Sequence, residues 1–253
     1  MAKTGLGTPI VQSPRGTFEG YKYRSGMGLV ECAEFFVRHD DFFGAVATNV
    51  PAGWAAAIID TGGTVTTYAT ATTGANGVLQ LTDATASEGA AFYGAKAVQL
   101  ISGKKFFMEA RILTDDVTDN AFQFGLADLS AVTNPEDLFT TASANLITAG
   151  ILDGSATLTM LSDKANSGST AESSTHANGT LSASTWATLA IAYDGGSELT
   201  LWKDGEKVLT WAQAFASTVP TATALAPFVG HINGNGAGGN LCLVDYVRIV
   251  AER

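Results

Sequence analysis

The stretch from Trp186 to Trp211 constrains the fold more than any other part of the chain. It holds three short runs in which apolar and polar residues alternate, and Asp204-Gly205 separates the second run from the third. Asp-Gly is a two-residue turn that accepts positive φ and matches the twist of the flanking strands. Three strands in a tight meander form an antiparallel sheet, whose apolar face must be covered by a second layer. The stretch therefore predicts an all-β fold.

Other runs along the chain repeat the strand pattern. Residues 104–113 alternate, and one side of the alternation is apolar throughout, so Phe106, Met108, Ala110 and Ile112 are expected to face a core. Further strands are predicted at residues 54–59, 65–71, 78–82, 90–93, 98–101, 121–127, 146–152, 157–162, 227–232 and 241–250. Residues 163–185 are polar and predict a long loop or a weakly paired ribbon. About a dozen short antiparallel strands pack most simply as a two-sheet sandwich.

Composition favours the same fold class. Glycine contributes 28 residues and charged residues make up only 15% of the chain, a mixture that suits short strands and tight turns better than long helices. Residues 29–43 are the best short helix candidate because their apolar residues could share a stripe, with a strand as the alternative. Asn134-Pro135-Glu136-Asp137 is a plausible start for a second helix.

The amino-terminal residues differ in character from the rest. Residues 1–30 are rich in Gly, Pro and Ser and carry a formal charge of +3, whereas the remainder carries −13. Such a segment cannot bury enough apolar area to order itself, so one interpretation is a flexible tail. Its aromatic residues favour an extended arm that orders against another surface. We expect an arm over residues 1–44, with a possible short helix, and a sandwich over 45–253. The arm residues expected to bind a partner are Phe18, Tyr21, Tyr23 and Arg24.

Charge and hydropathy exclude several classes of partner. A net charge of −10 argues against nucleic acid, because phosphate binding needs a basic surface. No run of about 18 apolar residues exists, so no membrane helix is expected. The first residues lack the apolar core of a signal peptide, which predicts synthesis and use from the cytoplasm. In that compartment Cys32 and Cys242 are expected to be reduced, buried thiols, with a disulfide between them as the alternative.

Three segments together resemble a known superfamily. They are the run from Trp186 to Tyr193 (WATLAIAY), the run from Leu199 to Gly205 (LTLWKDG), and the run from Val244 to Ile249 (VDYVRI). They resemble the concanavalin A-like jelly roll, which includes laminin G-like domains, legume-type lectins and family 16 glucanases. The resemblance covers roughly residues 45–253 and implies a two-sheet antiparallel jelly-roll sandwich. It implies little about function, because this fold hosts many unrelated activities.

A narrower resemblance rests on the overall composition of the chain. A low-charge jelly roll rich in Ala, Thr and Gly, with a Gly-rich arm and no signal peptide, resembles the decoration, or cement, proteins of tailed-phage capsids. This implies a virion structural protein made in the host cytoplasm, located on the capsid surface, and bound to the major capsid protein as a homo-oligomeric dimer or trimer. The alternative is a lectin-like module that binds glycans, which a virion could carry as a host-surface adhesin. A glycoside hydrolase is the third hypothesis.

Catalytic motifs are not found in the sequence. Family 16 glucanases carry their carboxylates in a Glu-x-Asp-x-x-Glu pattern, which places the acid and the nucleophile on one strand face. No Glu in this chain stands two residues before an Asp. Residues 234–239 match G-x-G-x-x-G, but a strand follows where the dinucleotide fingerprint needs a helix, so a turn is expected. We predict no catalytic residue and no cofactor.

A few individual residues are candidates for binding a metal or a sugar. His39-Asp40-Asp41 could touch a metal, although lone histidines are more often hydrogen-bonded or exposed. Asp115, Asp116 and Asp119 could bind calcium weakly or form a solvated acidic turn, and no calcium-loop spacing is present. We therefore predict no metal site. Trp202 is the candidate for stacking on a sugar ring, with a place in the core as the competing interpretation.

Overall fold

The computed structural model describes most of the chain beyond the amino-terminal segment. The described residues are 35–40, 42, 54, 56–59, 64–67, 77–83, 85–128, 145–164, 170–196, 198–211, 223–234 and 240–252. Strands β1 to β15 are the regular elements in this part of the chain, and it contains no helix. Within the same residues there is accordingly no helix with the length and apolar character needed to cross a membrane.

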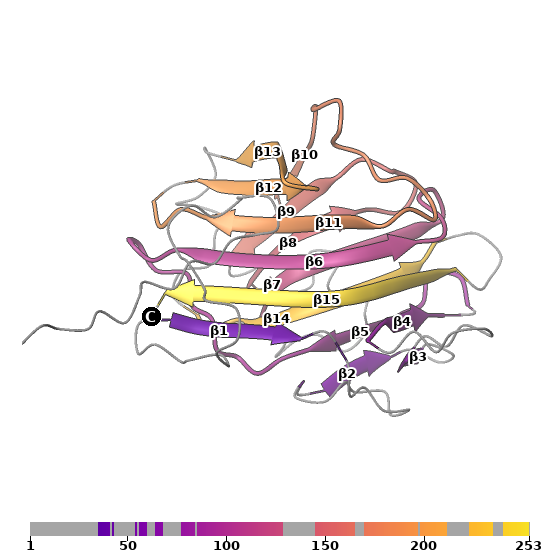
Figure 1. Ribbon diagram of the computed structural model, residues 1–253, viewed down its shortest axis with the longest axis horizontal. Coiled ribbons are helices and arrows are strands. Elements are labelled where there is room, and N and C mark those ends of the chain that lie inside the picture. Colours follow the sequence, from indigo (N-terminus) through magenta and orange to yellow (C-terminus); the bar gives the residue numbers. More distant parts are fainter. Residues whose placement is uncertain are drawn as a thin grey trace, which may run out of the picture.

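Two antiparallel sheets are stacked face to face (Figure 1). The eight-stranded sheet has the order β13 (Glu206–Trp211), β12 (Leu199–Lys203), β11 (Ala187–Tyr193), β6 (Phe106–Thr114), β15 (Leu241–Glu252), β4 (Leu79–Thr82) and β3 (Thr64–Thr67), and β1 (Phe35–Asp40) also pairs with β15. The seven-stranded sheet has the order β10 (Thr170–Ser173), β9 (Thr159–Lys164), β8 (Asn145–Ile151), β7 (Asn120–Ala127), β14 (Ala226–Asn233), β5 (Gly89–Tyr93) and β2 (Ala56–Ile59). The predicted all-β sandwich is confirmed.

The meander predicted from the sequence is present. β11, β12 and β13 lie side by side, and the turn between β12 and β13 has φ of 52° at Asp204 and 82° at Gly205. Positive φ at both central residues is the geometry that Asp-Gly favours in a hairpin. A register shift between Leu201 and Trp202 marks a bulge in this hairpin, and bulges increase the local twist of a strand.

The main core lies between the two sheets. The apolar side of β6 contributes Phe106, Met108, Ala110 and Ile112, as alternation predicted. The facing sheet contributes Phe92, Phe122, Phe124 and other fully buried side chains. Cys242 also points into this core as a free thiol, and its burial raises the pKa of the thiol well above the usual range, with a further contribution from Asp115. The expectation of a buried, reduced thiol is confirmed for Cys242, while Cys32 lies outside the described residues.

Some local predictions were wrong. Within residues 29–43, for which a helix was favoured and a strand was the alternative, the strand holds: residues 35–40 form β1, which pairs with β15 from Phe35 opposite Glu252 to Asp40 opposite Val247. The part of β15 that β4 leaves unpaired offers six successive pairings, and these outweigh a weak helical stripe. Residues 98–101 make only an isolated bridge, from Val98 to Leu225. In 163–185 the ribbon alternative holds, because β10 pairs with β9. The proposed helix start at 134–137 lies outside the described residues.

Candidate functional site

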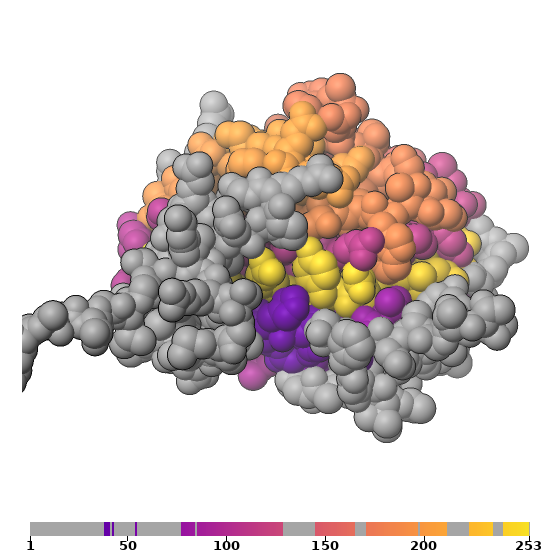
Figure 2. Space-filling model, in the orientation of Figure 1, coloured from indigo at the N-terminus to yellow at the C-terminus, as the bar shows by residue number. Residues whose placement is uncertain are grey.

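A cluster of charged and aromatic residues lies on the outer face of the eight-stranded sheet. Alternation along β6 turns Glu109 and Arg111 away from the core, and β15 places Asp245, Tyr246 and Arg248 beside them. We call these five residues the outer polar cluster. Figure 2 shows this face of the molecule, with the atoms of β15 and β1 in contact near its centre.

A bulge in β15 assembles the outer polar cluster. The register of β15 against β6 shifts between Val244 and Tyr246, so that Asp245 is the extra residue and Tyr246 lies opposite Arg111. A bulge turns side chains that regular alternation would separate toward one face. Asp245 thereby reaches the Arg111 guanidinium and forms an ion pair with it.

Glu109 is the most buried member of this cluster. It is 1% exposed, although it points away from the core between the sheets. The Tyr246 hydroxyl donates to Glu109 Oε1 at 3.0 Å, and Arg248 Nη1 lies 3.9 Å from the same oxygen. Burial raises the pKa of Glu109, and the charge of Arg248 and the Tyr246 hydrogen bond only partly offset this. Burial and the Glu109 charge together raise the pKa of Tyr246 to about 12, so its hydroxyl remains a donor at neutral pH.

Aromatic rings flank the charged groups. The Arg111 guanidinium lies 4.8 Å from the centroid of the Trp186 ring, within cation–π range. The His39 ring centroid is 5.8 Å from that of Tyr246. The Arg111–Asp245 pair is partly exposed, so it contributes at most about 1 kcal/mol to stability. Charged hydrogen-bonding groups beside aromatic rings are suited to binding a polar ligand or a partner surface.

Trp202 lies on the same outer face and not in the core between the sheets. Its half-buried ring packs against a small outer cluster formed by Phe107, Ala190 and Val250. The ring nitrogen Nε1 donates to Thr200 Oγ1 at 2.9 Å. The interpretation of Trp202 as a core residue was wrong, because β12 presents Leu199 and Leu201 to the core and Trp202 to the opposite side. Its role in sugar stacking remains a prediction.

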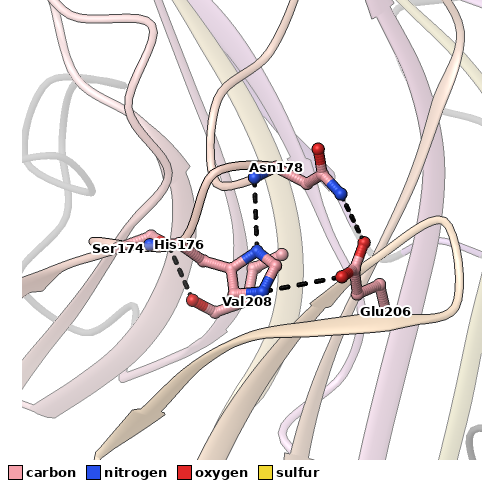
Figure 3. A network of polar contacts seen from close by, with 5 residues as sticks. All are labelled: Ser174, His176, Asn178, Glu206 and Val208. Atoms are coloured by element: carbon pink, nitrogen blue, oxygen red, sulfur yellow. Dashed lines mark hydrogen bonds and ion pairs between the residues drawn. The ribbon is translucent and has the colours of Figure 1, made fainter.

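A second polar network joins the edges of the two sheets (Figure 3). The buried Ser174 hydroxyl, just after β10, donates to the Val208 carbonyl of β13 at 2.6 Å. Glu206 accepts from Asn178 Nδ2 at 2.6 Å and lies 3.5 Å from His176 Nε2. Since Ser174 occupies a backbone acceptor on an edge strand, we interpret this network as structural protection of the β13 edge.

The central part of the outer face of the seven-stranded sheet is buried. Nine of its outward residues are at most 5% exposed, and one of them is a carboxylate: Ala91, Gln123, Ala127, Leu146, Thr148, Thr159, Leu161, Asp163 and Phe228. Toward the ends and the β10 edge of this face the exposure rises, since Ile232 is 8% exposed, Tyr93 is partly exposed and Ser173 is exposed. β7 and β8 also approach closely, since a Cβ added at Gly150 would lie 1.8 Å from the Phe122 carbonyl oxygen. A groove that accepts a polysaccharide must be lined by residues that water can reach, and the buried central residues do not meet that condition.

The acidic residues considered as metal ligands have structural partners. Asp116 Oδ1 accepts from the backbone N–H groups of Thr118 and Asp119 and from the Thr118 hydroxyl, and these bonds lower the pKa of Asp116. Asp40 accepts from Trp54 Nε1 at 2.8 Å, while Asp41 lies outside the described residues. Within the described ranges, no group of three or more His, Cys, Asp or Glu side chains is arranged to hold a metal.

Sequence reasoning did not identify the outer polar cluster. Alternation along residues 104–113 indicated that Glu109 and Arg111 point outward. The register of β6 against β15, and the bulge at Asp245, are tertiary features without a local sequence signal. The predicted arm residues Phe18, Tyr21, Tyr23 and Arg24 lie outside the described residues, so their role stays a prediction.

Comparison with known proteins identifies the fold. Scans against models of protein families and against curated proteins give no match. Arcelin-5, a lectin-like defence protein from Phaseolus vulgaris, has a TM-score of 0.57 at 9% identity, covering 86% of this chain and 98% of that one. Lectin II from Ulex europaeus has a TM-score of 0.55 at 14% identity, covering 86% and 99%. A β-1,3-glucanase from Mycobacterium marinum has a TM-score of 0.53 at 14% identity, covering 89% and 100%.

Lectins and glycosyl hydrolases therefore share the architecture of this chain at very low sequence identity. Such a likeness shows the fold and leaves the activity open, because one fold hosts many functions. The chain has the concanavalin A-like jelly-roll fold found in lectins and β-glucanases.

Proposed function

We propose that this chain is a virion structural protein that decorates a phage capsid and acts by adhesion without breaking bonds. The observation that favours adhesion over hydrolysis is the burial of the central outer face of the seven-stranded sheet. Hydrolysis of a polysaccharide needs two carboxyl groups in an open groove, about 5–10 Å apart. Gln123, Thr148 and Asp163, on that face, are fully buried. The fold then serves as a rigid body with adhesive surfaces.

The carboxylates of the outer polar cluster also favour binding over catalysis. Glu109 Oε1 is engaged by Tyr246 and Arg248, and Asp245 is paired with Arg111. These contacts hold both carboxylates in fixed positions and balance their charge. Engaged charges beside Trp186 and Trp202 provide a surface for a partner, and the major capsid protein is the partner we propose.

The arm would attach to the body at a defined corner. β1 begins opposite Glu252, near the end of β15, and continues along β15 to Asp40. An amino-terminal arm leading into β1 would therefore extend from a point held by strand pairing. Several weak contacts, made by the arm and the body of each subunit in a dimer or trimer, would add up to tight binding.

Deletion of residues 1–30 is expected to leave a folded body that no longer docks on capsids. The deletion leaves β1 intact and removes a segment of charge +3 together with Phe18, Tyr21 and Tyr23. Binding to undecorated capsids would be measured by co-sedimentation, with folding checked by circular dichroism. Normal decoration by the deletion variant would refute the role of the arm. Failure of the intact chain to bind any capsid, together with turnover of β-glucans, would refute the proposed function.

A second candidate function is glycan binding, favoured by the position of Trp202 on the outer face. An aromatic ring supported from beneath by Phe107, Ala190 and Val250 can stack on a sugar, with the outer polar cluster supplying hydrogen bonds. Under this hypothesis Trp202→Ala reduces glycan-array binding about five- to tenfold, because stacking contributes about 1–1.5 kcal/mol. The exposed Ile101→Ala substitution is the control. Absence of specific binding by the intact protein would exclude this candidate.

A further inference from the structure

One end of the sandwich concentrates carboxylates. β4, β6 and β14 end there, and β5, β7 and β15 begin there, at the right-hand side of Figure 1. Six acidic residues lie in the connections at this end: Asp83, Glu88, Asp115, Asp116, Asp119 and Asp153. Residues 83–88, 115–119 and 152–158 contain no Lys or Arg. The negative charge at this end is therefore not balanced by basic residues of the same connections.

Asp83 is buried and forms no ion pair with any described residue. It directly follows β4 and is fully buried. Its Oδ1 accepts from the Thr85 backbone N–H at 2.7 Å. Its Oδ2 is shielded from solvent and has no hydrogen-bond partner among the described residues. A buried polar oxygen without a hydrogen bond is costly, so a donor or a cation is expected to face it.

Asn233 directs a second acceptor into the same region. It is the last residue of β14 and is fully buried. Its Nδ2 donates to the Thr85 carbonyl at 3.2 Å, which leaves Oδ1 as an acceptor with no partner among the described residues. Because Asp83 binds the N–H of Thr85 and Asn233 binds its C=O, the two side chains converge on one residue.

Glu88 has a third shielded oxygen, in addition to those of Asp83 and Asn233. The Asn233 backbone N–H donates to the Glu88 carbonyl at 2.9 Å, so the two residues lie opposite each other just beyond the paired parts of β5 and β14. Alternation from Ala90, which is in the core, directs Glu88 toward the same side of β5. Its Oε2 is shielded and has no hydrogen-bond partner within the described part of the chain.

His231 faces Asn120 through one ring nitrogen. It lies two residues before Asn233 on the same side of β14 and is fully buried. Asn120 Nδ2 donates to Thr114 and Asp115, so Asn120 Oδ1 is free to accept from His231 Nε2 at 2.9 Å. His231 Nδ1 is then a further acceptor, and it too has no partner among the described residues.

We propose that Asp83, Glu88 and Asn233 form a binding site for a divalent cation, with Ca²⁺ as the best fit. The unpartnered groups are all acceptors, and two of the three oxygens belong to carboxylates, whose combined charge a divalent ion neutralises. Carboxylate and amide oxygens are hard ligands that Ca²⁺ accepts in flexible geometry, with water completing the coordination. Mg²⁺ requires near-ideal octahedral geometry and loses water reluctantly, so it binds more weakly. A bound ion would tie the β4–β5 turn to the end of β14.

The test uses the full chain after treatment with EDTA. Titration with CaCl₂ at constant ionic strength is expected to show saturable heat by calorimetry. It should also raise the melting temperature by about 5 °C or more when Ca²⁺ exceeds its dissociation constant about 100-fold. MgCl₂ at the same concentration should give a smaller shift.

Two isosteric variants test whether Asp83 and Glu88 bind the ion. Glu88→Gln and Asp83→Asn each remove one charge, and both are expected to reduce Ca²⁺ affinity at least about tenfold. Glu88→Gln serves alone if Asp83→Asn fails to fold. Glu172→Gln is the matched control, since it removes an exposed carboxylate on β10 and should leave the response unchanged. The proposal is overturned if Ca²⁺ neither binds nor shifts the melting temperature, or if Glu88→Gln responds like the unmodified protein.

Discussion

Replacing Phe92 by Ala is expected to destabilise the fold by about 3–5 kcal/mol, the usual range for a fully buried Phe. Phe92 lies on β5 and is completely buried between the sheets. Its ring packs edge-on against Trp54, with centroids 4.5 Å apart, and against Phe42 at 5.7 Å. Removing the ring loses apolar burial and two aromatic contacts, and it leaves a cavity that the rigid sheets cannot close. Urea unfolding followed by fluorescence measures the change.

Ile101→Ala provides the control for the Phe92 substitution. Ile101 is 40% exposed and is the one large apolar side chain exposed among the described residues. Its loss should change the free energy of unfolding by less than about 0.5 kcal/mol, as expected for surface positions. If Phe92→Ala were no more destabilising than this control, the packing of Phe42, Trp54 and Phe92 described above would be incorrect.

The sequence was sufficient to predict the elements whose signals are local. The Asp204-Gly205 turn and the alternation of β6 both depend on neighbouring residues, and the structure confirms both. β1 was different because its conformation depends on β15, which lies about 200 residues later in the sequence. A short apolar run can be a helix or a strand, and the partner decides.

The same limit applies to the candidate sites. The side of β12 that carries Trp202 followed from alternation, but which side faces the core depends on where Leu199 and Leu201 pack. The outer polar cluster requires the register between β6 and β15 and the bulge at Asp245. The Asp83, Glu88 and Asn233 group combines the end of β14 with the β4–β5 turn, which are about 150 residues apart in sequence. No local pattern specifies such long-range neighbours.

Lowering the pH from 7 to 4 is expected to destabilise the fold by about 3 kcal/mol through His231 alone. Burial lowers the pKa of His231 to about 3 in the folded state, compared with 6.5 for an unperturbed ring. Between these values the unfolded chain binds a proton that the folded chain does not. The contribution of His231 is therefore fully present above pH 6.5, and it decreases by about 1.4 kcal/mol for each pH unit below that value until about pH 3.

Comparing the pH dependence of stability of two variants with that of the unmodified protein isolates the contribution of His231. His231→Gln retains an N–H donor for Asn120 Oδ1 but cannot titrate, so its stability should decline less steeply on acidification than that of the unmodified protein. Val229→Ala, on the same side of β14, should lower stability at every pH without changing the slope. Glu109 has a raised pKa and acts in the opposite direction, but it is present in all three proteins and cancels in the comparison. Equal pH slopes for His231→Gln and the unmodified protein, measured by urea unfolding from pH 7 to 4, would show that His231 is not held neutral in the core.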